Sequence, residues 1–276
     1  MVGAHRDHSP VPPDDIRACI VIPFYNHAGS IAQVVSELKS LGLRCYLVND
    51  GSGAECEPVL NELAAREAEW LRVISYRPNQ GKGAAVMTGL EAAYRDGYTH
   101  ALQIDADGQH RAGDLQILLQ LSRQHPRAMI TGYAVYDASV PKSRLYGRYA
   151  THIWVWINTL SLQIRDSMCG LRAYPLAATM SVLDKARRAW LLRIGKRMSF
   201  DIEILVHLYW QGVRIVNVPV PVTYPLDGVS HFKVWRDNVQ ISAAHTRMFV
   251  GMLWHAPWLL IRMLLRGTDH RAENQL

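Results

Sequence analysis

The sequence predicts an α/β fold with a mostly parallel central sheet and helices on both of its faces. Two patterns in the chain and its composition support this prediction. Apolar segments of strand length alternate with longer segments of helical periodicity across residues 17–131. A polar cluster follows each of the first four apolar segments, as expected where parallel strands meet a binding edge. The composition, with 49% hydrophobic and 20% charged residues, provides a sizeable core and excludes a disordered chain.

The first strand, the first helix and the second strand have clear boundaries. Residues 17–23 form a short apolar run typical of a buried parallel strand. We expect Ser30 to cap the following helix, with Gln33 three residues further on, and Gly42 to end it. Residues 43–48 then form the second strand, which runs into an Asn-Asp-Gly-Ser-Gly cluster.

The alternation continues to residue 131. We expect strands over 71–76, 101–104 and 128–131 and helices over 55–69, 82–95 and 115–123. Strand–helix–strand units of this length need right-handed crossovers, which make the sheet mostly parallel. The clusters after the first four strands read PFYN, NDGS, RPNQGKG and DADGQH. Ligands of such sheets bind beyond the carboxyl ends of the strands, so these clusters are expected to form one site.

The net charge of +6 is concentrated in one part of the chain. Residues 141–200 contain eleven Lys and Arg against two Asp and Glu, whereas residues 1–140 are net negative. A basic block of this kind suits an anionic partner such as a phosphate, a nucleic acid or an acidic lipid surface, or it is a solvated face. Because the predicted sheet edge is acidic, we expect no nucleic-acid partner.

The cysteines and the chain ends argue against several classes of protein. The four cysteines form no CxxC pair, which argues against a zinc ribbon or a secreted disulfide scaffold and fits reduced thiols in the cytosol. Residues 1–15 are polar and proline-rich, so we expect a flexible leader and no signal peptide. No stretch of about 20 residues is free of charge, so no clear transmembrane helix is predicted.

Two carboxylates follow the fourth predicted strand. Asp105 and Asp107 have a spacing that, on an extended chain, lets both side chains point the same way. Together they can bind one divalent cation, and oxygen ligands suit Mg²⁺ or Mn²⁺, which keep waters and bind substrate phosphates. Gln109 and His110 are close enough to join them. The alternative is a surface turn, because Asp-Gly is a frequent turn pair.

The second and third clusters allow two interpretations each. Asp50 can accept hydrogen bonds from a ligand or can cap the next helix. Residues 77–83 lead into a helix N-terminus, where backbone amides favour anions. This segment is no phosphate-binding P-loop, because the GxxxxGK[ST] spacing is absent, and a GxGxxG fingerprint is missing as well.

Six stretches, taken in order, resemble the family-2 glycosyltransferases, and among them the dolichyl- and polyprenyl-phosphate sugar synthases. They read IVIPFYN, VNDGS, RPNQGKGAAVMTGL, LQIDADGQH, DSMCGLRAYP and FDIEILVHLYWQGVRIVNVPVPVTY and span roughly residues 17–240. The resemblance implies a single nucleotide-sugar-binding domain of the GT-A type. It also implies an inverting displacement at the anomeric carbon of a nucleotide diphosphate sugar.

The resemblance also implies roles for residues at the sheet edge. The positions that match the nucleotide-sugar site are Pro23, Tyr25, Asn26, Asp50, Lys82 and Asp105. The metal positions are Asp105, Asp107 and Gln109, together with His231 in a later loop. A divalent ion there, Mg²⁺ or Mn²⁺, would neutralise the charge of the leaving diphosphate.

On the acceptor side the resemblance implies catalytic roles for Asp166, Asp201 and Glu203. A base at Asp201 or Glu203 would deprotonate an acceptor hydroxyl, whereas an ionised phosphate needs none. The alternative for Asp201 is that its side chain caps the N-terminus of the helix in this segment. Ser199 is a competing candidate for that cap.

Arg144 and Arg148, one turn apart, match a basic stretch that would bind acceptor phosphate, and the alternative is two surface charges. Three positions depart from the usual pattern: Asn49 replaces an acid, Arg111 a proline and Leu171 a phenylalanine. The substitution at Asn49 bears on contacts with the base or ribose, and the one at Arg111 weakens the assignment to the lipid-phosphate branch.

Two segments suggest contact with a membrane surface. Residues 185–197 alternate basic and apolar side chains, and residues 248–265 combine tryptophan, leucine and arginine. The alternative for the second segment is a helix packed on the catalytic domain. We expect a glycosyltransferase domain over 16–240 and a membrane-surface helical tail over 241–276.

The sequence therefore predicts a metal-dependent inverting glycosyltransferase on the cytoplasmic, inner face of the cell membrane. Its expected partners are a nucleotide diphosphate sugar and a lipid or lipid-phosphate acceptor. One alternative is transfer to a hydroxyl of a glycolipid or polysaccharide. The other is a binding protein that keeps the fold and has lost the chemistry.

Overall fold

One mixed sheet organises the chain. The computed structural model describes residues 16–136, 142–222 and 234–273. Its seven strands are β1 (Ala18–Phe24), β2 (Cys45–Asp50), β3 (Leu71–Tyr76), β4 (His100–Gln103), β5 (Met129–Tyr136), β6 (Arg172–Pro175) and β7 (Ile215–Val222), in the spatial order β3-β2-β1-β4-β6-β5-β7. The five strands expected over residues 17–131 are all present, with ends shifted by up to five residues.

The sheet is mostly parallel, as predicted, with one reversed strand. β1 pairs in parallel with β2 and β4, β2 with β3, and β5 with β7. β6 lies between β4 and β5 and is antiparallel to both. The carboxyl ends of β1, β2 and β4 therefore share one edge, at which the first polar clusters meet.

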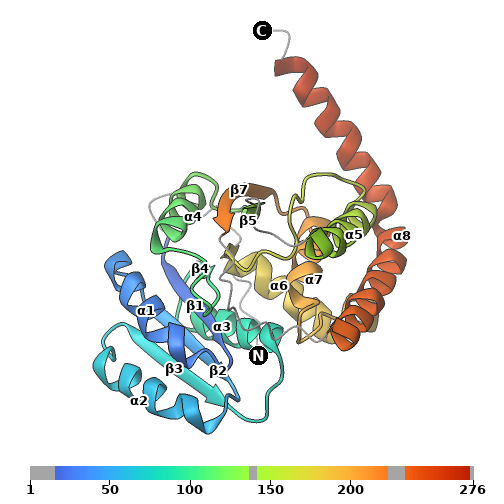
Figure 1. Cartoon of the computed structure of the whole chain (residues 1–276). Coiled ribbons are helices and arrows are strands. Elements are labelled where there is room, and N and C mark those ends of the chain that lie inside the picture. Colours follow the sequence, from blue (N-terminus) through green and yellow to red (C-terminus); the bar gives the residue numbers. More distant parts are fainter. Residues whose placement is uncertain (1–15, 137–141, 223–233, 274–276) are drawn as a thin grey trace, which may run out of the picture.

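Helices cover both faces of the sheet (Figure 1). They are α1 (Ala28–Leu38), α2 (Glu57–Arg66), α3 (Lys82–Arg95), α4 (Ala112–Gln124), α5 (Lys142–Thr159), α6 (Leu176–Arg188), α7 (Phe200–Trp210) and α8 (Val234–Glu273), with short 3-10 turns η2 (Lys39–Leu41), η3 (Ala54–Cys56) and η4 (Trp190–Leu192). Alternate residues of β1 point to opposite faces. Ile20 and Ile22 pack against α1, α2 and α4, whereas Cys19 and Val21 belong to the core formed with α3, α6 and α7.

The start of α1 differs from the prediction. Its N-cap residue is His27, and Ser30 lies within the first turn. The Ser30 hydroxyl donates to the carbonyl oxygens of His27 and Ala106, so the prediction of Ser30 as the cap was wrong. Its hydroxyl is used to join α1 to the loop after β4. Gly42 does end the following turn η2, in the left-handed conformation at φ +62° that glycine adopts most easily.

α7 and α8 complete the core on one side. Every residue of α7 is buried, so its acidic side chains need partners inside the protein. α8 packs against α5, α7 and η4, and its C-terminal part projects beyond the rest of the described chain (Figure 1). The boundary expected at residue 240 falls within this helix. None of the helices in the described ranges combines the length and the hydrophobicity that a membrane span requires.

Candidate active site

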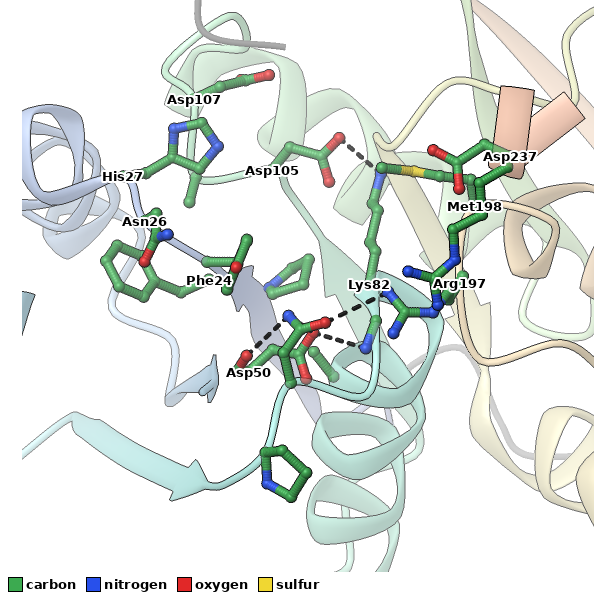
Figure 2. A pocket seen from close by; sticks show the side chains of 18 residues that line it. Phe24, Asn26, His27, Asp50, Lys82, Asp105, Asp107, Arg197, Met198 and Asp237 are labelled. Carbon is green, nitrogen blue, oxygen red and sulfur yellow. Dashed lines mark hydrogen bonds and ion pairs between the residues drawn. The ribbon is translucent and has the colours of Figure 1, made fainter. Parts of the chain in front are cut away.

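A cavity of about 620 Å³ opens at the carboxyl ends of β1, β2 and β4. Figure 2 shows its side chains, which come from the first four polar clusters, from residues 197–198 and from the first turn of α8. The sequence-predicted residues that line it are Pro23, Tyr25, Asn26, Asp50, Lys82, Asp105 and Asp107. The fold thus brings together side chains that are up to 84 positions apart in the sequence, because each follows a strand that ends at the same edge.

Asp50 holds the loop that precedes α3. Its carboxylate accepts hydrogen bonds from the backbone amides of Gln80 (2.7 Å) and Gly81 (2.8 Å) and from the side-chain amide of Asn79 (2.8 Å). Gly81 has φ +111°, and a Cβ there would lie 2.6 Å from the Lys196 carbonyl oxygen. The carboxylate and the glycine together fix the shape of the loop beside the cavity.

Lys82 bridges two carboxylates. Its ammonium nitrogen lies 2.8 Å from Oδ2 of Asp105 and 3.1 Å from Oδ2 of Asp201, and Figure 2 shows the side chain extending toward Asp105. Burial works to lower the pKa of Lys82, but the two carboxylates outweigh it and raise that pKa above the usual lysine value. Lys82 therefore remains charged and connects the loop after β4 to the start of α7.

Asp105 and Asp107 differ in their electrostatic surroundings. Burial opposes ionisation of Asp105, but Lys82 more than offsets it and lowers its pKa. Burial and the nearby Asp105 raise the pKa of Asp107, whose Oδ1 accepts a hydrogen bond from the Gln109 amide at 3.0 Å. Gln109 itself is outside the cavity lining. Among the described residues, Asp105 thus has an ion-pair partner in Lys82, and Asp107 forms no ion pair.

Gly170, at the end of the Asp166–Gly170 turn, leaves room for the Asp105 carboxylate that lines the cavity. A Cβ at Gly170 would lie only 2.1 Å from Oδ2 of Asp105. Any larger residue there would push the Asp105 carboxylate out of its place. The glycine of the DSMCG stretch is therefore required by a carboxylate 65 positions earlier in the chain.

Asp166 lies outside the cavity lining and joins three elements. Its carboxylate accepts hydrogen bonds from the amides of Ala134, Met168 and Cys169 and pairs with Arg148 of α5. Burial opposes its ionisation, but Arg148 and the amides prevail and lower the pKa of Asp166. Arg148, expected to bind an acceptor phosphate, is thus already paired in this structure.

The two acids of α7 have different surroundings. Asp201 touches Lys82 and lies 3.6 Å from the fully buried Arg172. Glu203 lies away from the cavity lining: its carboxylate accepts from the Gly195 amide at 2.6 Å and pairs with Arg247 of α8. Burial raises the pKa of Glu203, although the Gly195 amide and Arg247 each act to lower it. Of the two, only Asp201 contacts a residue of the cavity.

Two predicted residues cannot be placed. His231 lies outside the described residues, and Arg144 is placed only in the backbone of α5. Their expected roles stay predictions.

Comparison with known proteins identifies the chain. The sequence profile described as "Glycosyl transferase family 2" matches residues 19–185, more than half of the chain. The protein belongs to glycosyl transferase family 2. It is therefore an enzyme that transfers a sugar from a nucleotide sugar, and the family expected from the six stretches is confirmed.

Two relatives and one solved structure show what this glycosyltransferase is similar to. The chain is 26% identical to a UDP-N-acetylglucosamine–dolichyl-phosphate N-acetylglucosaminyltransferase of Methanococcus voltae, covering 74% of this chain and 85% of that protein. It is 26% identical to a polyprenol monophosphomannose synthase of Mycolicibacterium smegmatis, covering 83% and 85%. Glucosyl-3-phosphoglycerate synthase of Mycobacterium tuberculosis, solved with Mn²⁺ and UDP-glucose, shares the fold with a TM-score of 0.58 at 15% identity, covering 88% and 79%.

The residues present fit a divalent cation that completes its shell from the substrate. No group of three or more His, Cys, Asp or Glu side chains suited to a metal occurs in the described ranges. Mg²⁺ and Mn²⁺ need only one or two carboxylates when phosphates and waters supply the rest, and Asp105 and Asp107 both line the cavity. His110 interacts electrostatically with both, and its buried Nδ1 lacks a hydrogen-bond partner among the described residues.

The cavity of this glycosyltransferase also contains residues that sequence reasoning missed. They are Phe24, His27, Asn79, Arg197, Met198, Arg236 and Asp237. Asn79 and Arg197 lay within segments singled out for other reasons, and they bond to each other at 3.3 Å. Arg236 and Asp237 begin α8, and no local pattern in the sequence indicated that this turn returns to the sheet edge.

Proposed function

We propose that this glycosyltransferase moves a hexose, with inversion, from a nucleoside diphosphate sugar to a lipid-linked phosphate, assisted by Mg²⁺ or Mn²⁺. The observation that carries the proposal is the cavity lined by Asp105 and Asp107, in which Asp105 pairs with Lys82 beside the loop held by Asp50. The acceptor class is supported by the names of the two relatives, which act on dolichyl phosphate and polyprenol.

The chain's own residues supply most of the donor site. The N-terminus of α3 follows the loop held by Asp50 and favours the negative charge of a diphosphate. Lys82 and Arg197 add two cations to the same cavity. Asp105 and Asp107 would hold the divalent ion, which neutralises the charge that develops on the leaving diphosphate. Pro23, Tyr25 and Asn26 line the side of the cavity at the end of β1, where we place the nucleoside.

Replacement of Asp201 distinguishes between the two candidate classes of acceptor, a phosphate and a hydroxyl. A phosphate acceptor is already ionised, whereas a hydroxyl of a glycolipid or polysaccharide needs a base. The ion pair between Asp201 and Lys82 places a carboxylate next to the cavity, which keeps the hydroxyl alternative open. With a phosphate acceptor, Asp201→Asn should retain part of the transfer activity. With a hydroxyl acceptor it should abolish transfer while nucleotide affinity, measured in parallel, stays near that of the wild type.

Nucleotide binding tests the donor site directly. We expect one of UDP, GDP, CMP and TDP to bind the wild-type protein in isothermal titration calorimetry, with an affinity that depends on Mn²⁺. Asp107→Asn should lose the Mn²⁺ dependence, and Asp184→Asn, at a surface carboxylate that is 60% exposed, should keep it. A folded protein that binds none of these nucleotides would contradict the proposed donor site.

The proposed acceptor also implies contact with a membrane surface, at the cytoplasmic, inner face of the cell membrane. α5 and α8 pack together and expose large apolar side chains, among them Ile153, Trp154, Leu253 and Trp254. Exposed tryptophan and leucine on neighbouring helices suit the interfacial region of a bilayer. Attachment there would bring a lipid acceptor to a nucleotide sugar that is dissolved in water.

A further inference from the structure

A second cavity, of about 550 Å³, lies between α3, α6 and the turn η4. It is separate from the donor cavity, although residues of the same two loops border both: Gln80 and Lys196 line the second cavity, and their neighbours Gly81 and Arg197 line the first. Lys196 donates a hydrogen bond to the Gln80 side chain at 3.1 Å, which forms part of the wall between them. The two cavities share no lining residue, and the proposed donor site does not use the second one.

The lining of the second cavity has an excess of positive charge. Arg187, Arg188, Arg193 and Lys196 contribute four cations, and Glu91 is the carboxylate among its lining residues. Arg187 pairs with Glu91 and with Asp184. Neither Arg188 nor Arg193 forms an ion pair within the part of the chain that the structure describes. Two unpaired guanidinium groups beside a cavity suit a phosphate, which arginine binds through paired N–H donors.

The other walls of this cavity are apolar. Leu183 and Ile194 are buried, Met87 is half-buried, and Trp190 at η4 is 72% exposed. A free phosphate would leave these walls in contact with water. A phosphate attached to a hydrocarbon chain would use both kinds of surface, because tryptophan and arginine together are favoured at the membrane interface.

The neighbourhood of the second cavity fits the same partner. η4 packs against α8, the helix that carries exposed Leu253, Trp254 and Trp258. η4 is thus in contact with the helix through which we propose that the protein attaches to a bilayer. The charge and apolar character of the cavity complement an anionic lipid at that surface.

We propose that the cavity between α3, α6 and η4 binds the phosphate headgroup of an anionic membrane lipid. Arg188 and Arg193 would bind the phosphate, and Trp190 with the apolar walls would contact the adjoining part of the lipid. This lipid is not the acceptor of the sugar, and the site needs only binding. The proposal therefore stands or fails independently of the proposed transferase reaction.

The test uses the full chain and a monomeric lipid, dihexanoylphosphatidic acid, in calorimetry. We expect saturable binding with one site per protein and much weaker binding of inorganic phosphate. Arg188→Gln with Arg193→Gln should weaken lipid binding at least about tenfold, since it removes both guanidinium groups that would bind the phosphate. Trp190→Ala should weaken binding of the lipid and leave the weak phosphate binding unchanged.

The matched control is Arg123→Gln with Arg127→Gln, which removes two exposed arginines near α4 on the other side of the sheet. This variant has the same net charge as the first and should bind the lipid like the wild type. An equal loss in both double variants would overturn the proposal in favour of general electrostatic attraction. Equal affinity for inorganic phosphate and the lipid would overturn the assignment of a lipid. Melting temperatures within a few degrees of wild type establish that the variants fold.

Discussion

At the scale of single residues, Lys82 has the most consequential position. Its ammonium lies between Asp105 and Asp201, so in this structure it occupies the place next to Asp105 where a divalent cation would add positive charge. A cation that binds to Asp105 and Asp107 must compete with Lys82 for the same carboxylate. A nucleoside diphosphate relieves that competition, because its phosphates attract both cations.

Replacement of this lysine should change metal affinity. We expect Lys82→Gln to bind Mn²⁺ without nucleotide about tenfold more tightly than the wild type, since the competing charge near Asp105 is removed. Electron paramagnetic resonance of free Mn²⁺ measures this affinity without relying on activity. Weaker or unchanged Mn²⁺ binding would contradict the competition between Lys82 and the metal.

Gly170 provides a second prediction for a single residue. Its substitution by alanine would place a Cβ 2.1 Å from the Asp105 carboxylate. We expect Gly170→Ala to displace Asp105 and to weaken Mn²⁺-dependent nucleotide binding by about 10- to 100-fold, or roughly 1.4–2.8 kcal/mol.

A matched glycine exists in α4. A Cβ added at Gly113 meets no atom within 4 Å, and alanine has a higher helix propensity than glycine. Gly113→Ala should therefore keep nucleotide binding and raise the midpoint of urea unfolding. If both alanine variants bind nucleotide like the wild type, Gly170 has no role in placing Asp105.

At the scale of elements, Asp166 joins β5, α5 and the turn before β6. Its buried carboxylate is held by Arg148 and by three backbone amides. The chain therefore uses this acid to stabilise the architecture beside the cavity. A catalytic role for Asp166 would require it to leave these four partners.

The pKa of Asp166 gives a dependence of stability on pH. Because the folded-state pKa lies below the unfolded value near 3.9, the stabilisation is fully present above about pH 4 and is lost as the pH falls through the folded pKa. Asp166→Asn should be less stable than the wild type at pH 7 by about 3 kcal/mol, since Arg148 loses its buried partner. The difference should shrink below pH 4. Urea unfolding at several pH values measures it, and a difference independent of pH would contradict the ion pair as its cause.

At the scale of the whole molecule, α8 connects distant parts of the protein. Its first turn brings Arg236 and Asp237 to the donor cavity, and Arg247 pairs with Glu203 of α7. Further along, α8 exposes tryptophan and leucine side chains. One helix thus reaches from the proposed donor site to the proposed membrane surface.

This arrangement predicts which apolar residues bind lipid. Trp254 and Trp258 are 83% and 52% exposed on α8. We expect Trp254→Ala with Trp258→Ala to reduce binding to phosphatidylcholine vesicles at least tenfold in flotation, because each buried aromatic side chain contributes about 1.5–3 kcal/mol. Ile117→Ala, at an exposed apolar position on α4, is the control and should bind like the wild type. Equal binding by all three proteins would exclude attachment through α8.

Much of the fold was predictable because its signals are local. The alternation of apolar strands and amphipathic helices over residues 17–131 is a property of neighbouring residues, and the observed strands β1 to β5 follow it. The antiparallel β6 was not predicted. Its four residues are buried, and their sequence does not indicate whether the strand runs parallel or antiparallel to its neighbours. Its place between β4 and β5 depends on the rest of the sheet.

The site was predictable in part for the same reason. Asp50, Lys82, Asp105 and Asp107 each follow a strand, and strands of a parallel sheet end at one edge. The capping role given to Ser30 failed because its hydroxyl reaches Ala106, 76 positions away. Arg236 and Asp237 were missed because nothing near them in the sequence indicates where α8 begins relative to the sheet.

The sequence by itself determined the family, the α/β alternation and the order of the polar clusters, since these depend on residue types at short spacings. Only the tertiary structure decided which charges meet. It paired Lys82 with Asp105 and Asp201, Arg148 with Asp166, and Arg247 with Glu203, and it left Arg188 and Arg193 beside a cavity. The physical reason is that a charge gains or loses energy through neighbours in space, and these neighbours come from elements far apart along the chain.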